Sequence, residues 1–399
     1  MKFVKTLSAA AVSAALLGAT AASAADVTLY GIVDEGLLYS HVRENGSSTN
    51  SLSESSGLFA PSRWGMKGNE ELGNGLKVGF KVESGFNADT GALANEGKRL
   101  FHRESALTLS GGFGTVAAGR MGGVGSNSGT YDIVYAMSEV SDGSWGNVAG
   151  MFMSDRFDNM LTYQTPKFAG LQATVQYSFK GNDADDKNTE GTAKVDRYYG
   201  GALSYENGGL QAVVAYEYFN RGNDNAAEET ARSIRRNAQI ASLGGSYDFG
   251  VVKVFGLAQY ADGVDRFGYY GGTAAVNKAF GNYDETKETK ATDRMTYDGF
   301  KGWAAHLGAS APVCGGTLLG GLYYADAKAE KITVTGVAQD QKIDAKFYGV
   351  NAQYNYPLSK RTVVYAGASY GKTKIDGLTS ELDQEKETSQ GYVGLAHFF

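Results

Sequence analysis

The sequence of 399 residues has one cysteine, Cys314, and four histidines, at positions 41, 102, 306 and 397. A single thiol excludes an intramolecular disulfide framework, and the histidines do not have metal-ligand spacing. We therefore expect no metal site and no cofactor. No segment after residue 24 approaches 18 consecutive apolar residues, which excludes helices that span a membrane.

Proline is scarce, with four residues, whereas glycine is abundant with 55 and tyrosine and phenylalanine together contribute 25 + 19 = 44. Many glycines and aromatic residues with little proline are typical of a strand-rich chain with tight turns. The mean hydropathy of −0.29 is too polar for a helical membrane protein. A β-barrel in a membrane accommodates this value, because only alternate residues of each strand face lipid.

The N-terminal segment MKFVKTLSAAAVSAALLGATAASA has the features of an export signal. Lys2 and Lys5 precede an apolar run that starts near Leu7 and ends at Ala22-Ser23-Ala24. A charged start, an apolar middle and small residues before a cleavage point predict a secretory signal peptide over residues 1–24. The alternative is a transmembrane anchor. Cleavage would leave residues 25–399 as a single barrel domain and move the formal charge from −6 to −8.

Apolar and polar residues alternate with period 2 along most of the remaining chain. In GLKVGFKVES, residues 75–84, leucine, valine and phenylalanine alternate with lysine, glycine and glutamate. The segments LQATVQYSF, residues 171–179, and LQAVVAYEY, residues 210–218, alternate in the same way. This period indicates β-strands with one apolar face. A soluble antiparallel sheet alternates similarly, so the repetition along the chain carries the prediction.

Short and long connections alternate between these strands. Short Gly-containing turns, such as residues 73–75, 111–114 and 207–209, suit hairpins. Longer polar segments, such as His41–Ser56 and Gly263–Gly299, separate them and read as loops. Counting strands gives sixteen, from near Val27 to the last strand at Gln390–Phe399. This pattern predicts an all-β, 16-stranded antiparallel transmembrane barrel with an aqueous lumen.

The chain ends on an apolar strand, GYVGLAHFF. Val393, Leu395, His397 and Phe399 share one face of it. We expect Phe399 to lie at the lower aromatic girdle, where rings are stable at the boundary between lipid and water. The last strand must also pair with the first strand to close the barrel.

Several segments resemble the general diffusion porins of Gram-negative outer membranes, particularly those of β-proteobacteria and Neisseria. They are DVTLYGIVDEGLLYS, SRWGMKGNEELGNGLKVGFKVE, GGFGTVAAGRM, DNMLTYQTPKFAGLQATVQYSF and YVGLAHFF. The resemblance covers nearly the whole mature chain. It implies a homotrimer of sixteen-stranded barrels, each with its own pore. It also implies that the strand ending at Phe399 is the signal read by the outer-membrane assembly machinery.

One long connection, about residues 122–157, is rich in glycine, apolar and aromatic residues and has few charges. Loops of this length are usually functional or disordered, and this composition suits a loop that packs against other residues. By the resemblance, it is the constriction loop that folds into the barrel and narrows the pore. A surface loop is the alternative interpretation.

The resemblance and the alternation together select candidate residues for the pore constriction. Arg63 and Arg120 occupy the positions of family arginines, although simple alternation places Arg120 on the apolar face of its strand. Lys67 and Lys81 are expected on the lumen side. A further family position, near Thr162–Gln164, is uncharged here, which leaves a preference for anions open. The candidate acidic residues of the loop are as follows: Asp132, Glu139 and Asp142.

The predicted function is passive diffusion of ions and small hydrophilic solutes across the outer membrane of a Gram-negative bacterium, with no enzymatic activity. Fixed charges in a narrow passage select ions by sign. The basic stretch Arg232–Arg236 could contact lipopolysaccharide phosphates and is too short to indicate nucleic-acid binding. A substrate-specific channel is an alternative, and so is a surface adhesin or secreted binding protein. A glycosidase is weaker, since no paired carboxylate motif stands out.

Overall fold

The computed structural model describes residues 26–94, 99–138, 150–179, 195–222, 236–264, 266–267, 271–272, 295–296, 298–334, 341–376 and 384–399. These residues form antiparallel strands and one short helix, α2, at Val134–Ser138. The predicted signal peptide at residues 1–24 lies outside the described residues. No helix within these ranges is long and apolar enough to cross a membrane.

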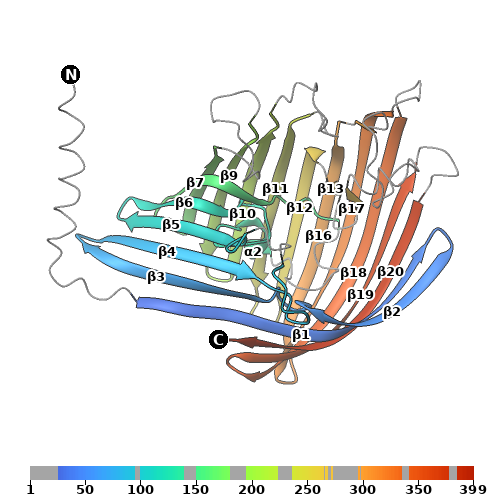
Figure 1. Ribbon diagram of the computed structural model, residues 1–399, viewed down its shortest axis with the longest axis horizontal. Helices are drawn as coiled ribbons and strands as arrows, with labels where there is room; N and C mark the ends of the chain where they lie inside the picture. The colour runs from blue at the N-terminus through green and yellow to red at the C-terminus, as the bar shows by residue number, and fades with distance from the viewer. Residues whose placement is uncertain are drawn as a thin grey trace.

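The barrel strands run in chain order around one sheet, and β13 and β14 form a separate two-stranded sheet (Figure 1). The barrel strands are β1 (Asp26–Glu44), β2 (Ser47–Ser56) with β3 (Arg63–Gly73), β4 (Leu76–Gly85), β5 (Glu104–Gly111), β6 (Gly114–Gly122), β7 (Arg156–Gln164), β8 (Leu171–Ser178), β9 (Arg197–Asn207), β10 (Leu210–Asn220), β11 (Ala238–Asp248), β12 (Lys253–Val264), β16 (Phe300–Val313), β17 (Gly316–Val334), β18 (Gln341–Ser359), β19 (Thr362–Asp376) and β20 (Gln384–Phe398). Three further short strands lie between β12 and β16: β13 (Arg266–Phe267), β14 (Gly271–Gly272) and β15 (Met295–Thr296).

The second barrel strand is interrupted. β2 pairs with the C-terminal part of β1, from Glu35 to Glu44, and β3 pairs with the N-terminal part, from Asp26 to Ile32. We call the six residues between them, Gly57–Ser62, the elbow. Counting β2 and β3 as one strand, the described residues give 1 + 1 + 9 + 5 = 16 barrel strands, which confirms the predicted number.

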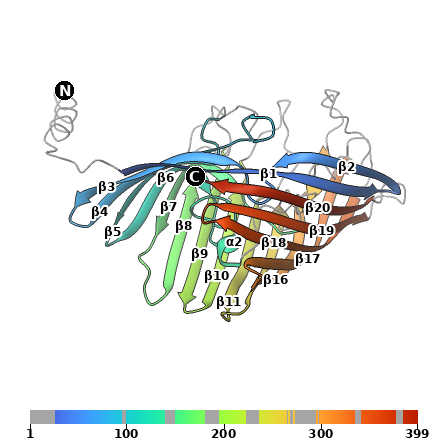
Figure 2. The same cartoon turned by 90° about the horizontal axis from the view of Figure 1, so that it is seen from below.

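The first and last strands close the barrel. β1 pairs antiparallel with β20 from Ile32 opposite Phe398 to Glu44 opposite Lys386, and the two strands lie side by side in Figures 1 and 2. The backbones of Gly31 and Phe399 exchange two hydrogen bonds of 3.0 and 3.1 Å. The ring of Phe399 lies over Gly31, where a Cβ atom would clash with the ring. The chain end is therefore held in the sheet.

Alternation places the expected sets of residues on the two faces. In β10, Val214 and Tyr216 are exposed while Val213, Ala215 and Glu217 are buried. Leucines on the same outward face, such as Leu243, Leu307 and Leu322, are about 60% exposed, at 62%, 63% and 59%. A continuous belt of exposed leucine, valine and tyrosine is stable only against lipid. The buried residues lie inside the barrel.

The short turns lie where glycine and the sequence pattern predict them. The turn between β3 and β4 contains Asn74 at φ 52° and Gly75 at φ 77°, a left-handed geometry that asparagine and glycine favour. The connection predicted as a loop at His41–Ser56 differs from the expectation. It is a hairpin in which β1 extends to Glu44 and β2 begins at Ser47, because Asn45-Gly46 forms a tight turn.

Candidate pore constriction

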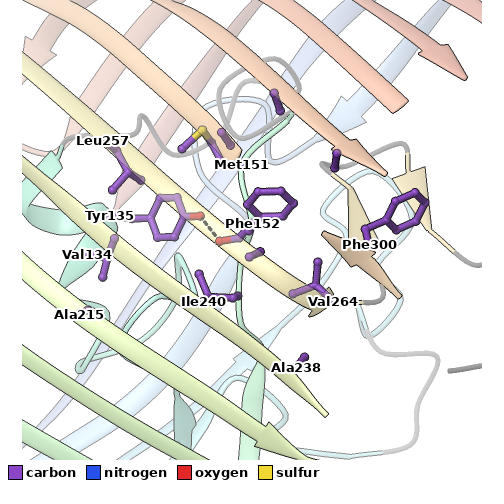
Figure 3. Packing of buried hydrophobic residues seen from close by; sticks show 14 of the residues in the cluster. Val134, Tyr135, Met151, Phe152, Ala215, Ala238, Ile240, Leu257, Val264 and Phe300 are labelled. Atoms are coloured by element: carbon purple, nitrogen blue, oxygen red, sulfur yellow. Dashed lines mark hydrogen bonds between the residues drawn. The ribbon is translucent and has the colours of Figure 1, made fainter. Parts of the chain in front are cut away.

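The connection between β6 and β7 is described over residues 123–138 and 150–155, and these parts lie within the barrel. Helix α2 packs against the inner faces of β10, β11 and β12. Apolar side chains of this loop, including Val134, Tyr135, Met151 and Phe152, join inward-facing residues of these strands in one buried cluster (Figure 3). The described parts of the loop thus occupy part of the lumen, as the sequence predicted.

The amide side chain of Gln259 on β12 fixes the second half of this loop. It accepts a hydrogen bond from the Phe152 backbone N–H at 3.0 Å and donates one to the Phe152 carbonyl at 2.9 Å. The Tyr135 hydroxyl donates to the same carbonyl at 2.9 Å, so both halves of the loop meet at this point (Figure 3). All three residues are buried, which makes each hydrogen bond costly to lose.

The carboxylate of Glu217 on β10 fixes the first half of the loop. It is fully buried and accepts hydrogen bonds from the Gly125 backbone N–H at 3.3 Å and from the Tyr198 hydroxyl at 2.7 Å. The same Tyr198 oxygen accepts a hydrogen bond from the Val124 N–H at 3.1 Å. Strands β9 and β10 are thus bound to the loop through buried polar groups. The alternation of apolar residues in the sequence does not indicate these hydrogen bonds.

A cluster of charged residues lies on the inner side of β3 to β5. Its centre is Glu83 on β4, whose side chain is 6% exposed. Arg103 Nε lies 2.6 Å from one oxygen of Glu83, and Lys81 and Arg63 lie 3.9 and 4.0 Å from the other. The Tyr30 hydroxyl also donates to Glu83, at 2.9 Å. Three basic side chains therefore share one carboxylate.

Glu104 on β5 joins this cluster to the loop between β6 and β7. Lys81 Nζ donates to Glu104 at 2.7 Å and to the Thr130 hydroxyl at 3.1 Å. The Thr130 hydroxyl and backbone N–H both donate to Glu104, at 2.6 and 3.2 Å. The loop is thereby attached to the charged wall as well as to the opposite strands.

Arg120 belongs to a second ionic group. Its guanidinium lies 2.7 Å from Asp158 on β7, which also pairs with Arg99 at 2.8 Å, and its Nε donates to the His102 carbonyl at 2.7 Å. The pairing of β6 with β7 shifts register between Gly119 and Met121, and this irregularity at Arg120 breaks the simple alternation. Arg120 pairs with Ser105 across β5 and β6 and does not contact Glu83.

The remaining predicted residues are dispersed. Lys67 lies 5.3 Å above the ring of Tyr30 and faces Lys81 across β3 and β4. Asp132 accepts a hydrogen bond from the Tyr135 N–H at 3.4 Å, at the start of α2. Glu139 and Asp142 lie outside the described residues, as does most of the Arg232–Arg236 stretch. The uncharged Thr162 is fully buried and accepts a hydrogen bond from Gln176 at 3.2 Å.

Sequence reasoning missed several charged residues of this region: Glu83, Arg99, Arg103, Glu104, Arg156 and Asp158. Glu83 could have been found, because it shares the inward face of Lys81 two positions away. His102, in the loop after β4, lies among Arg103, Arg120 and Arg156. Burial and then these arginines lower the pKa of His102 to about 4, so this ring is neutral at neutral pH.

The elbow places Arg63 at the edge of this cluster. The carboxylate of Asp34 on β1 is buried and accepts hydrogen bonds from the Phe59 and Ala60 N–H groups at 2.7 and 2.8 Å and from the Tyr365 hydroxyl at 2.6 Å. Arg63 follows directly and donates to the Pro61 carbonyl at 3.4 Å. Asp34, another residue that the sequence analysis did not select, therefore anchors the segment from which Arg63 projects.

The match to known proteins covers almost the entire chain. The family model described as Gram-negative porin matches residues 8–376. The chain belongs to the Gram-negative porin family. It is 35% identical to an outer membrane porin protein of Bordetella pertussis, covering 99% of this chain and 100% of that relative. It is 34% identical to outer membrane porin protein 32 of Delftia acidovorans, covering 99% of each chain.

Solved structures agree with the barrel. An anion-selective porin from Comamonas acidovorans superposes with a TM-score of 0.59 at 26% identity, over 94% of this chain and 100% of that one. Among relatives compared by sequence alone, a Neisseria gonorrhoeae major outer membrane protein P.IB is 28% identical over 70% of this chain and 79% of that relative. The porin is therefore a channel of the outer membrane of a Gram-negative bacterium and not an enzyme, as the sequence predicted.

Proposed function

We propose that this porin passes small hydrophilic solutes and ions through a constriction with a modest preference for anions. The Glu83 and Asp158 groups support the proposal, since they place six basic side chains on one side of the barrel: Arg63, Lys81, Arg99, Arg103, Arg120 and Arg156. Four carboxylates lie among them: Glu83, Glu104, Asp155 and Asp158. The excess is 6 − 4 = 2 positive charges. Fixed charge of one sign in a narrow passage raises the local concentration of ions of the opposite sign.

On the opposite side of the lumen, the described carboxylate beneath the loop is already hydrogen-bonded. Along the inner faces of β9 to β12 the described loop covers the wall, and its central carboxylate, Glu217, is occupied by hydrogen bonds to the loop and to Tyr198. Glu217 therefore opposes the basic side of the barrel less than a carboxylate exposed to the ion path would. The name of the Comamonas acidovorans structure, an anion-selective porin, agrees with this direction.

A substrate-specific channel with an aromatic ladder has less support. The inward-facing rings of Tyr323, Tyr365 and Tyr392 are at most 6% exposed, because neighbouring side chains cover them. A ladder that guides sugars must present its ring faces to the solute. Within the described residues, rings on this wall serve packing.

We further propose that the porin is a homotrimer and that its last strand is the signal for the outer-membrane assembly machinery. The strand that ends at Phe399 has the apolar outward face Val393, Leu395 and Phe399 and pairs with β1 along its length. Closure of the barrel depends on this strand, so recognition of its end would couple assembly to closure. Truncation of Phe399 should lower the yield of folded trimer in the outer membrane.

Single-channel recording in a planar bilayer with a salt gradient tests the proposed conduction. Three equal conductance steps per insertion are expected for a trimer, and the reversal potential should indicate a preference for anions. Arg63→Ala should shift the reversal potential toward cations, whereas the matched control Arg361→Ala, at an exposed short turn, should leave it unchanged. A reversal potential that favours cations in the unmodified protein would contradict the proposed preference.

A further inference from the structure

Strand β2 has a neighbouring strand on one side only. It pairs with β1 from Ser47 opposite Glu44 to Ser56 opposite Glu35, and no other described strand pairs with it. The elbow separates it from β3, and the hairpin of β1 and β2 extends away from β3 and β4 (Figure 1). Residues 47–54 are all exposed. The other side of β2 is therefore an open edge of the sheet.

Alternate residues of β2 direct their backbone groups toward this open edge. The Asp34 carbonyl accepts a hydrogen bond from Gly57, next to β2, whereas the Asn45 N–H donates to Glu385, next to β20. Even-numbered residues of β1 thus bond toward β2, and their partners are the odd-numbered residues of β2. Because backbone groups of successive residues point to opposite sides of a strand, the remaining residues face the open edge: Ser48, Asn50, Leu52 and Glu54.

This edge lacks the usual protection against added strands. Natural edge strands carry lysine or proline, or are bent by bulges. The β2 sequence SSTNSLSESS contains no lysine, arginine or proline, and its register with β1 is continuous. The edge is also ordered, because the Tyr39 hydroxyl donates to the Asn50 side-chain oxygen at 3.0 Å and His41 Nδ1 lies 2.7 Å from the same atom. A straight, ordered edge can accept a further strand through its backbone groups.

Carboxylates gather at the elbow end of the edge. Glu54 and Glu35 lie on the same outward face of β2 and β1, and Asp89 acts electrostatically on Glu35 together with Glu54. The next residue of that loop, Ala88, donates its N–H to the Ser56 hydroxyl at 3.0 Å. Within the described ranges, no lysine or arginine forms an ion pair with any of these three carboxylates. A basic side chain beside them would offset their mutual repulsion.

We propose that the open edge of β2 binds an extended segment of another polypeptide that carries a basic residue. The segment adds a strand to the sheet through the backbone groups of the four residues that face the open edge. Its lysine or arginine lies beside Glu54 and Asp89. The turn Asn45-Gly46 belongs to the end of the barrel with the long connections, so the edge is presented on the outer side of the membrane. The inference is independent of the proposed preference for anions.

A synthetic peptide of about ten residues, alternating threonine and valine with one central lysine, tests the proposal. Its binding to the detergent-solubilised porin is measured by fluorescence anisotropy. Asn50→Pro combined with Leu52→Pro removes two N–H groups at the open edge and no hydrogen bond to β1, since proline is tolerated at a free edge. The matched control, Asn50→Ala with Leu52→Ala, loses the same side chains and keeps both N–H groups. The proline variant should bind the peptide at least about tenfold more weakly than the alanine variant, because two backbone hydrogen bonds are lost.

A charge exchange tests the basic residue. The same peptide with glutamate in place of lysine should bind the unmodified porin more weakly, and Glu54→Lys should reverse this order. Equal binding by the proline and alanine variants, or of the two peptides, would overturn the proposal. It would also be overturned if the unmodified porin bound neither peptide and the proline variant lost its oligomeric state, because a second copy of the chain would then occupy the edge. Heat-modifiable migration on a denaturing gel checks folding, and an unchanged reversal potential separates this inference from the proposed conduction.

Discussion

Replacement of Glu83 by glutamine should make the channel prefer anions more strongly. Glu83 is the carboxylate shared by Arg63, Lys81 and Arg103. Glutamine retains an oxygen that can accept the 2.6 Å hydrogen bond from Arg103, and its amide group can donate to the Tyr30 hydroxyl. The substitution therefore removes one negative charge and retains most of the local geometry.

The size of the effect follows from Coulomb's law. An ion passing about 8 Å from this charge in a water-like dielectric experiences about 0.5 kcal/mol from it. Screening at about 0.1 M salt, where the Debye length is about 10 Å, roughly halves this energy. Because the energy has opposite signs for anions and cations, the ratio of their permeabilities should rise about two- to threefold.

The assay is the reversal potential of single channels in a potassium chloride gradient near about 0.1 M. The E83Q channel should shift toward anions, and the shift should almost vanish near about 1 M, where the Debye length is only about 3 Å. Glu206→Gln, which removes an exposed carboxylate paired with Lys167 at the short-turn end, is the control and should have no effect. A shift of E83Q toward cations, or none, would refute the assignment of Glu83 to the ion path.

Two further substitutions test how the constriction is held. Gln259→Ala removes both hydrogen bonds to Phe152 and leaves a buried N–H without a partner, which costs about 1–3 kcal/mol. We therefore expect larger fluctuations of the open-channel current in this variant. The control Gln211→Ala, near the short-turn end, should not increase these fluctuations. Asp34→Ala leaves the Phe59 and Ala60 N–H groups and the Tyr365 hydroxyl without their acceptor. Asp34→Ala should lower the unfolding free energy by about 3–5 kcal/mol. It should also shift the reversal potential toward cations, because Arg63 is no longer held in place. Tyr365→Phe should cause a smaller loss of unfolding free energy and a smaller shift; equal effects of the two variants in calorimetry and in reversal potential would contradict the anchoring role of Asp34.

The barrel could be predicted from sequence because each strand repeats the same local rule. The alternation in residues 210–218 places Val214 and Tyr216 toward lipid and Glu217 toward the lumen, and the structure agrees. The rule depends only on the pleat of the strand and on a solvent that is apolar on one side. The glycine turns follow equally local chemistry.

The elbow was not predicted, because its cause is distant in the sequence. Gly57 and Pro61 indicate a break in the strand, but the acceptor that stabilises the break is Asp34, and the hydroxyl that completes it belongs to Tyr365, 331 residues from Asp34. Gln259 is likewise 107 residues from the loop residue Phe152 that it binds. A single sequence contains no signal that joins such pairs.

Arg120 illustrates a limit of both kinds of sequence evidence. Alternation places it on the apolar face, whereas the family motif places it in the constriction. The structure contains an irregularity here, with Gly119 at φ +140° and a register shift, and Arg120 pairs with Asp158. The effect of Arg120 on a passing ion depends on how fully Asp158 neutralises its charge. This is a property of the ion pair, and neither the motif nor the alternation predicts it.

In the proposed conduction, the sign of the charge preference depends on which wall the β6–β7 loop covers. Glu83 and Glu217 are both glutamates that face inward by the same alternation. Glu217 lies where the loop packs, and its carboxylate accepts hydrogen bonds from the Gly125 N–H and the Tyr198 hydroxyl in a buried layer. Glu83 lies among basic residues, and in the proposed ion path its charge contributes to the field that an ion crosses. A loop docked on the other wall would reverse these roles without any change in the strands, and the composition of the lumen alone therefore does not determine selectivity.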